Sequence, residues 1–259
     1  MARVRRALTG PHQVAVVSLK GGVGRTTVSA LLGLTLAEHR EDRVIVVDST
    51  PAGGTLSDRL TGATGPGIRD LLDRLDVDDV HSLADIELFS GAVGNLRVLA
   101  SDQDLSRNLA LNGLEYERVC LLLQRHFPII VTDGATGPAL PATLSLAHGV
   151  VVVGSFTVDG AVRAGKTLDW LVAHGYRDLA GRAVLALDGD RASDDVDAAR
   201  LRELFAARFR AVVEIPHDRH LAQGGRIDAS ALADGTRDAV LELAALVADE
   251  FGTVTAGRR

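Results

Sequence analysis

The sequence has little cysteine, little lysine and no long apolar run. Its single cysteine, Cys120, stands in an apolar stretch and has no partner for an internal disulfide, which suits a buried thiol in a reducing compartment. No stretch reaches the roughly 18–20 continuous apolar residues that a membrane span requires. The basic start, residues 1–6, lacks the apolar run of a signal peptide. These absences predict a soluble, cytoplasmic protein.

Of the 28 basic residues, only Lys20 and Lys166 are lysine. Such a bias is typical of GC-rich coding, in which arginine readily replaces lysine, so a lysine at position 20 indicates a site that needs an ammonium group. The net charge is −6 and the pI is about 5.7, which gives no support to nonspecific binding of nucleic acid. The net charge leaves open whether a local patch of basic residues binds nucleic acid.

The most informative stretch is residues 18–27, which read Ser-Leu-Lys-Gly-Gly-Val-Gly-Arg-Thr-Thr. It follows an apolar run over 14–17, which reads as a buried strand, and it leads into a helical pattern over 28–38. A glycine-rich turn between a strand and a helix lets backbone N–H groups point inward, and the helix start adds a positive dipole end. This geometry predicts a phosphate site; the competing interpretation is a turn that binds nothing.

The stretch departs twice from the usual P-loop pattern, G-x-x-x-x-G-K-[ST]. Leu19 stands where the first glycine belongs, and Arg25 stands where the lysine belongs. Arginine keeps the positive charge, but its planar fork is longer than a lysine ammonium group, so the exchange is not conservative in a tight loop.

Apolar runs and helical patterns alternate along the rest of the chain. Charged and apolar residues over 113–127 predict a helix that turns Leu114, Val119, Leu122 and Leu123 inward. Six or seven strands alternating with helices predict an α/β fold of the P-loop NTPase type, a doubly wound, mostly parallel sheet of about seven strands with helices on both faces. We expect one domain over 12–252, with flexible tails over 1–11 and 253–259. The expected strands are 13–18, 43–48, 95–100, 128–133, 149–154, 182–187 and 211–216.

Acidic residues stand where several of these strands end. Asp48, Asp133 and Asp188 each close an apolar run, and Pro216 closes the last one. Ligands of parallel sheets bind at the carboxyl ends of strands, so these residues and the glycine stretch are expected to meet. Asp133, followed by glycine, has the form of a Walker B motif that holds Mg²⁺, and water is the expected bridge. Taken alone, Asp133 also reads as a turn-capping aspartate.

Lys20 to Thr27, with the strand ends at Asp48 and Asp133, resembles the MinD/ParA family of deviant Walker A P-loop ATPases. The resemblance covers nearly the whole chain, from 14 to about 251. Phrases at 48–56, 99–104, 158–161 and 215–225 are similar to an actinobacterial MinD-like branch, which includes EspI-like ATPases associated with type VII secretion.

The resemblance implies ATP and Mg²⁺ as cofactors and an ATP-dependent homodimer that binds an unknown partner protein. In such a dimer, Lys20 reaches the partner's nucleotide, and Lys20 and Asp48 take the catalytic positions. Thr26, Asp48 and Asp133 take the metal positions. The implied nucleotide contacts are Lys20, Gly21, Gly22, Val23, Gly24, Arg25, Thr26, Thr27, Asp188 and Pro216, the last two beside the base.

Three residues depart from the family pattern: Arg25, Thr50 in place of an acid that positions the attacking water, and Asp188 in place of an asparagine. We therefore expect a dimeric switch with slow or impaired hydrolysis, acting in protein positioning, partitioning or type VII secretion. The alternative is a pseudo-ATPase adaptor that binds partner proteins without turnover. A DNA-partitioning ATPase is the weakest of the three readings because of the net acidity. The polar end after Phe251 does not fit a membrane-binding amphipathic helix.

Overall fold

The computed structural model describes residues 1–51, 53–62, 65–77, 80–102, 110–134, 137–189 and 198–252. The tail expected over 253–259 lies outside these ranges. The strands are β1 (His12–Val17), β2 (Val44–Asp48), β3 (Gly91–Val93), β4 (Leu96–Leu99), β5 (Ile129–Asp133), β6 (Gly149–Ser155), β7 (Val184–Asp188) and β8 (Ala211–Ile215).

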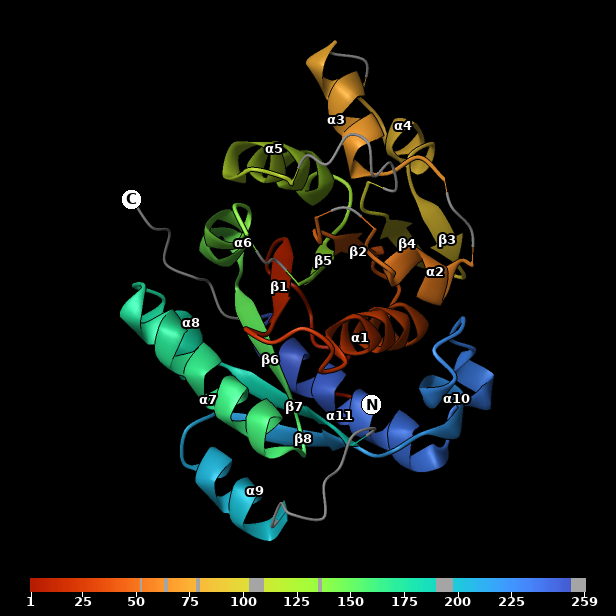
Figure 1. The fold of residues 1–259 in the computed structure, drawn as a ribbon. Coiled ribbons are helices and arrows are strands. Elements are labelled where there is room, and N and C mark those ends of the chain that lie inside the picture. The colour runs from red at the N-terminus through yellow and green to blue at the C-terminus, as the bar shows by residue number, and fades with distance from the viewer. Residues whose placement is uncertain are drawn as a thin grey trace.

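Most of the helices connect these strands, and the last two follow β8. The helices are α1 (Arg25–His39), α2 (Leu56–Leu60), α3 (Ile68–Asp76), α4 (Leu83–Glu87), α5 (Gly113–Gln124), α6 (Leu140–Leu146), α7 (Val158–Ala173), α8 (Arg177–Gly181), α9 (Ala198–Ala206), α10 (Arg219–Ala222) and α11 (Asp234–Ala248), with a short 3-10 turn at Ala229–Ala231. Helices lie on both faces of the sheet, α1 and α11 on one and α5, α6 and α7 on the other (Figure 1).

The strands form one eight-stranded sheet in the order β3-β4-β2-β5-β1-β6-β7-β8. Every neighbouring pair is parallel except β3 with β4. The predicted α/β class is therefore confirmed, with one strand more than the seven expected. The additional strand, β3, has three residues, Gly-Ala-Val, which is too short for a periodic pattern to reveal.

Alternate residues of the central strand supply two separate cores. Val14 and Val16 of β1 pack with α1 and α11, whereas Ala15 and Val17 pack with α7 and its neighbours. Successive side chains of a strand point to opposite faces, so a strand covered on both faces has no polar side. This explains why 14–17 is a continuous apolar run, and it places the end of β1 at the centre of the molecule.

Residues 3–9 pack against the domain, where the sequence suggested a flexible tail. Val4 is fully buried in the core beside α1 and α11, and the guanidinium of Arg40 donates to its carbonyl oxygen. Arg3 forms ion pairs with Glu242 at 3.0 Å and Asp249 at 2.6 Å. A single buried valine and ion pairs between residues so far apart in sequence produce no periodic pattern, so this packing could not be predicted from the sequence.

Leu114 was expected to face inward, and this expectation is wrong. Its side chain is 74% exposed, whereas Tyr116, Val119 and Leu123 of the same helix are buried. Leu114 stands two residues before Tyr116, about 200° around the helix from it. The helix therefore presents Leu114 to the side opposite its buried stripe.

Candidate functional site

The glycine stretch forms a turn between β1 and α1, as its pattern predicts. Gly22 and Gly24 have φ angles of 74° and 87°, in the left-handed region that favours glycine. A Cβ atom at position 24 would lie 2.0 Å from Oδ2 of Asp188. Helix α1 begins at Arg25 without a side-chain cap on its first N–H groups. The turn therefore offers uncapped backbone donors on a helix start, which is the arrangement that cradles phosphate.

A cavity of about 330 Å³ opens beside this turn. Its volume falls in the range of small-molecule sites. Thr55 contributes to the wall although it was not predicted as a site residue; it follows the glycines after Asp48, and only that position could have drawn attention to it. The lining residues are Gly22, Gly24, Arg25, Thr26, Thr27, Thr55 and Asp188.

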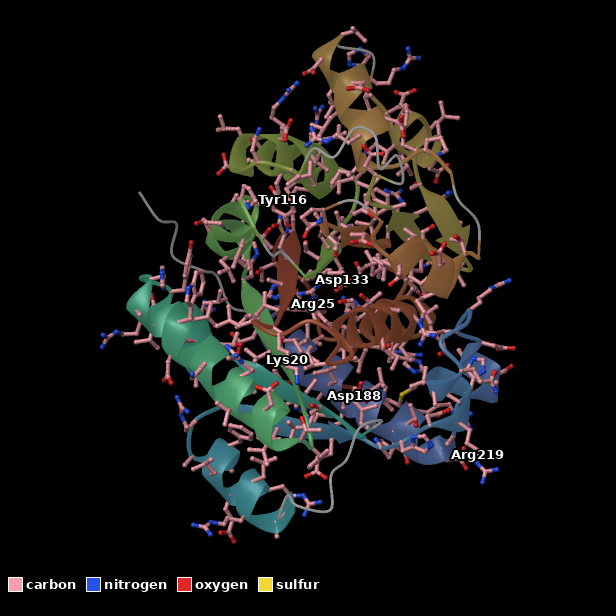
Figure 2. The ribbon with its side chains drawn as sticks, in the orientation of Figure 1. Lys20, Arg25, Tyr116, Asp133, Asp188 and Arg219 are labelled. Carbon is pink, nitrogen blue, oxygen red and sulfur yellow. The ribbon has the colours of Figure 1, made fainter. Side chains whose placement is uncertain are left out.

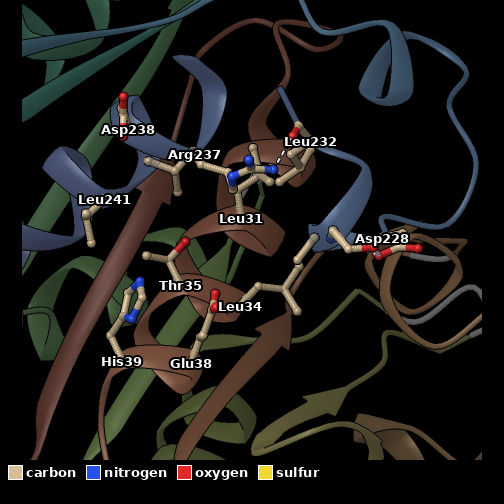
Figure 3. Close-up of a pocket in the computed structure, with 13 residues that line it drawn as sticks. Leu31, Leu34, Thr35, Glu38, His39, Asp228, Leu232, Arg237, Asp238 and Leu241 are labelled. Atoms are coloured by element: carbon tan, nitrogen blue, oxygen red, sulfur yellow. Dashed lines mark hydrogen bonds between the residues drawn. The ribbon is translucent and has the colours of Figure 1, made fainter. Parts of the chain in front are cut away.

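A larger groove, of about 590 Å³, lies between α1 and α11 and includes Leu31, Leu34, Thr35, Arg237 and Leu241 in its wall (Figure 3). Among the described residues, its wall includes no glycine turn and no carboxyl end of a strand. The chemistry of phosphate binding therefore favours the smaller cavity as the candidate site.

Asp48 and Asp133 are register partners at the ends of β2 and β5, and both side chains are fully buried. The carboxylate of Asp48 accepts hydrogen bonds from the backbone N–H groups of Thr50, at 3.0 Å, and Leu56, at 3.2 Å. Burial, followed by the charge of Asp133, raises the pKa of Asp48 to about 6, while the bonds from Thr50 and Leu56 oppose the rise. Thr50, at the family's acid position, thus binds Asp48.

Asp133 faces the start of α1. Its Oδ1 accepts a hydrogen bond from the Ser29 hydroxyl at 3.0 Å and lies 3.5 Å from Nε of Arg25. Burial raises the pKa of Asp133, while Arg25, Thr26 and Ser29 lower it, in that order. Its Oδ2 has no hydrogen-bond partner among the described residues.

The residues present fit the nucleotide that the resemblance implies, and they fit its Mg²⁺ only in part. Gly24 leaves room that a Cβ would fill, and the buried Oδ2 of Asp133 is an orphaned acceptor. Thr26, in the first turn of α1, and Asp133, at the end of β5, are the hard oxygen donors that Mg²⁺ prefers, but Oδ1 of Asp133 already faces Arg25. Within the described ranges no three His, Cys, Asp or Glu side chains gather as a metal-ligand set.

Lys20 does not line the cavity. Its Nζ forms an ion pair with Oδ2 of Asp159 at 2.6 Å, and 34% of its side chain is exposed. Asp159 lies in the first turn of α7, and the hydrogen bond from Lys20 is the main cause that lowers its pKa. Sequence reasoning did not assign Asp159 a role, because an acid in the first turn of a helix is ordinary.

The two residues expected beside the base lie at different places. Asp188 closes β7 and its carboxylate lies over Gly24, in the cavity wall. Pro216, after β8, is exposed and lies next to Gly189, outside that wall. Figure 2 shows Lys20, Arg25, Asp133 and Asp188 gathered in the central part of the molecule. The structure thus brings together Gly22, Gly24, Arg25, Thr26, Thr27 and Asp188 at the cavity, with Val23 buried beneath and Gly21 exposed.

None of the helices among the described residues combines the length and the apolar character that a membrane span requires.

Comparison with solved structures places this geometry in a known fold. The chain superposes on a ParA family ATPase from Chlorobium tepidum TLS with a TM-score of 0.74 and 17% identity, covering 91% of this chain and 98% of the other. It superposes on the septum site-determining protein MinD of Pyrococcus horikoshii OT3, solved with Mg-ADP, with a TM-score of 0.66 and 18% identity over 95% of this chain and 98% of the other. At such identity the likeness shows the fold alone.

Comparison of sequences is more specific. The chain is 37% identical to the ESX-1 secretion-associated protein EspI of Mycobacterium tuberculosis H37Rv over all of its length, and it spans 39% of that relative. Residues 14–214 match the model of the CobQ/CobB/MinD/ParA nucleotide binding domain. The resemblance seen in the glycine stretch is therefore confirmed, and the chain belongs to the MinD/ParA family of nucleotide-binding domains.

Proposed function

We propose that this chain binds ATP in the cavity beside residues 18–27 and acts as a dimeric, nucleotide-dependent switch with slow hydrolysis. The observation that carries the proposal is the pair of left-handed glycines, Gly22 and Gly24, next to a 330 Å³ cavity at the ends of the strands. Protein positioning, partitioning or type VII secretion is the proposed setting, and the name of the EspI relative favours secretion.

The proposed roles follow from where each side chain lies. The backbone of Gly21 to Gly24 and the start of α1 bind the phosphates, because uncapped N–H groups favour negative charge. Thr26 and Asp133 supply oxygen atoms at the positions where the resemblance implies Mg²⁺, but the carboxylate of Asp133 already faces Arg25 there. Asp48 is oriented by the N–H groups of Thr50 and Leu56 toward the same edge.

Slow hydrolysis is proposed from two contacts. Arg25 pairs with Asp133, although the P-loop cation acts on phosphate, and Thr50 binds Asp48 and offers no carboxylate to a water molecule. Phosphoryl transfer depends almost entirely on positioning and on charge stabilisation, so both contacts remove contributions to the same step.

The dimer is tested by replacing Lys20. Lys20→Ala should lose ATP-dependent dimerisation, because the proposed contact of its ammonium group is a charge-assisted hydrogen bond to the partner's nucleotide. The dimer dissociation constant should rise by about tenfold or more. Sedimentation analysis with ATP and with ADP measures it, after calorimetry has established that ATP binds.

The other lysine provides the matched control. Lys166 is exposed on α7, and Lys166→Ala removes the same side chain from the same surface region. We expect it to dimerise as the wild type does. An ATP-dependent dimer that persists in Lys20→Ala would contradict the proposed role of Lys20.

The Lys20–Asp159 ion pair predicts a second effect on dimerisation. Since Lys20 is held within its own chain, it has to leave Asp159 before it reaches a partner. Asp159→Asn should therefore strengthen the ATP-dependent dimer by about two- to fivefold, as expected for an exposed pair. Asp169→Asn is the control, because Asp169 lies on the same helix as Asp159 and its pair with Arg208 is also exposed. A weaker dimer in Asp159→Asn would contradict the prediction.

The pseudo-ATPase adaptor remains the second candidate function. The observation that favours it is the contact of Arg25 with Asp133, which draws the loop's cation away from the phosphate positions. An adaptor of this kind predicts no saturable ATP binding at millimolar concentration. Steady-state phosphate release that Asp133→Ala abolishes would exclude it.

A further inference from the structure

Arg25 lies both in the wall of the proposed nucleotide cavity and beside the carboxylate of Asp133. It lines the proposed nucleotide cavity, and its Nε lies 3.5 Å from Oδ1 of Asp133 (Figure 2). The side chain is 14% exposed, and Nε has no hydrogen-bond partner among the described residues. A guanidinium group carries five N–H donors in a rigid fork, so one edge can face a carboxylate while others stay available to an oxyanion.

The end of β5 is shaped to admit this guanidinium group. A Cβ atom at Gly134 would lie 1.9 Å from Nε and 2.2 Å from Cζ of Arg25. Gly134 has a φ angle of 49°, which other residues rarely adopt. Arg25 therefore lies across the glycine that follows Asp133, in a space that any larger residue would fill.

The contact between Arg25 and Asp133 places a positive charge beside two buried carboxylates. Asp48 and Asp133 are both fully buried and adjacent in register, an arrangement that is unfavourable for two carboxylates unless a cation lies nearby. Among the ion pairs of the described residues, the one that reaches these acids comes from Arg25. The positive charge next to Asp133 is thus provided by the chain itself.

We infer that the Arg25 guanidinium group occupies the position beside Asp133 that a divalent cation would otherwise occupy, so that this chain binds nucleotide without requiring Mg²⁺. The inference rests on the proposed nucleotide binding. Mg²⁺ needs near-octahedral oxygen ligands and keeps several water molecules, and a guanidinium group already paired with Asp133 both repels it and fills part of that space. A lysine at position 25 would lack the planar fork and would leave Asp133 to the metal.

The test compares ADP binding by calorimetry in millimolar Mg²⁺ and in EDTA; ADP avoids the complication of dimerisation. For the wild type, the dissociation constant should change by less than about threefold between the two conditions. For Arg25→Lys it should rise by about tenfold or more in EDTA. Arg118→Lys makes the same exchange in a remote, exposed ion pair with Asp76 and should behave as the wild type.

The outcomes separate this inference from the proposed function. If ADP binding by the wild type weakens tenfold in EDTA, the inference is overturned while nucleotide binding stands. If EDTA has the same effect on the wild type and on Arg25→Lys, the inference is overturned as well, because Arg25 then makes no difference to the need for Mg²⁺. Absence of ADP binding in both conditions overturns both. Should Arg25→Lys fail to fold, electron paramagnetic resonance of Mn²⁺ added to the wild-type ADP complex decides. Almost no bound Mn²⁺ supports the inference, and one ion per ADP overturns it.

Discussion

Replacing Gly24 by alanine is expected to weaken ADP binding on the order of a hundredfold, because a strained left-handed residue and a displaced neighbour both act on the loop. The φ angle of 87° is unfavourable for alanine. In addition, the new methyl group would lie 2.0 Å from Oδ2 of Asp188, so that carboxylate has to leave its place in the cavity wall. Calorimetric titration of ADP measures the change.

The control for Gly24→Ala is Gly181→Ala. Gly181 is the last residue of α8, its φ angle is not in the left-handed region, and a Cβ there meets nothing within 4 Å. We expect this variant to bind ADP with wild-type affinity. Thermal unfolding of both variants separates a local defect of the loop from loss of the fold. Wild-type affinity in a folded Gly24→Ala protein would show that the nucleotide does not use this turn.

The sequence could predict those parts of the site that depend on local pattern. The run over 14–17 and the glycines after it specify a strand, a turn and a helix within one short segment, and Asp48 and Asp133 follow continuous apolar runs. Because parallel strands bring their carboxyl ends to one edge, these acids had to meet, and the register pairs them directly.

The contacts that tune the site could not be predicted. Asp159 is 139 positions from Lys20 and comes within 2.6 Å of it only because α7 starts beside the loop. Ser29 looks like an ordinary helical serine, yet its hydroxyl donates to Asp133. Such contacts depend on side-chain placement between elements that are distant in sequence. The direction of Arg25 is likewise invisible in the sequence, since a P-loop arginine reads equally as a phosphate ligand.

His12 is expected to make the protein sensitive to mild acid. Its side chain is 4% exposed at the start of β1, stacked on His148 at 5.1 Å and against the edge of Phe251 at 4.7 Å. Burial, followed by the charges of His148 and Arg182, lowers the pKa of His12 from its ordinary 6.5 to about 3. Between about pH 7.5 and about pH 5, this shift should lower the free energy of unfolding of the wild type by about 2 kcal/mol. The His12→Leu variant should not show this part of the loss.

The sign follows from which state binds the proton. Above pH 6.5 His12 is neutral in both states and its contribution to stability is complete; as the pH falls below 6.5 the unfolded chain takes up a proton that the native state refuses until about pH 3, so stability is lost. Asp48 acts in the opposite direction, because its pKa of about 6 lets the native state take up a proton first.

Denaturant unfolding at several pH values tests the His12 prediction, since Asp48 and His148 are present in both proteins and their contributions largely cancel in the difference. His174→Leu removes an exposed histidine on the C-terminal side of α7 and is the control for the loss of a histidine as such. An identical slope in the wild type and His12→Leu would mean that His12 is protonated in the folded protein. The buried contacts with His148 and Phe251 would then have to open at mild acid, which a fall in protection of the β1 amides would reveal.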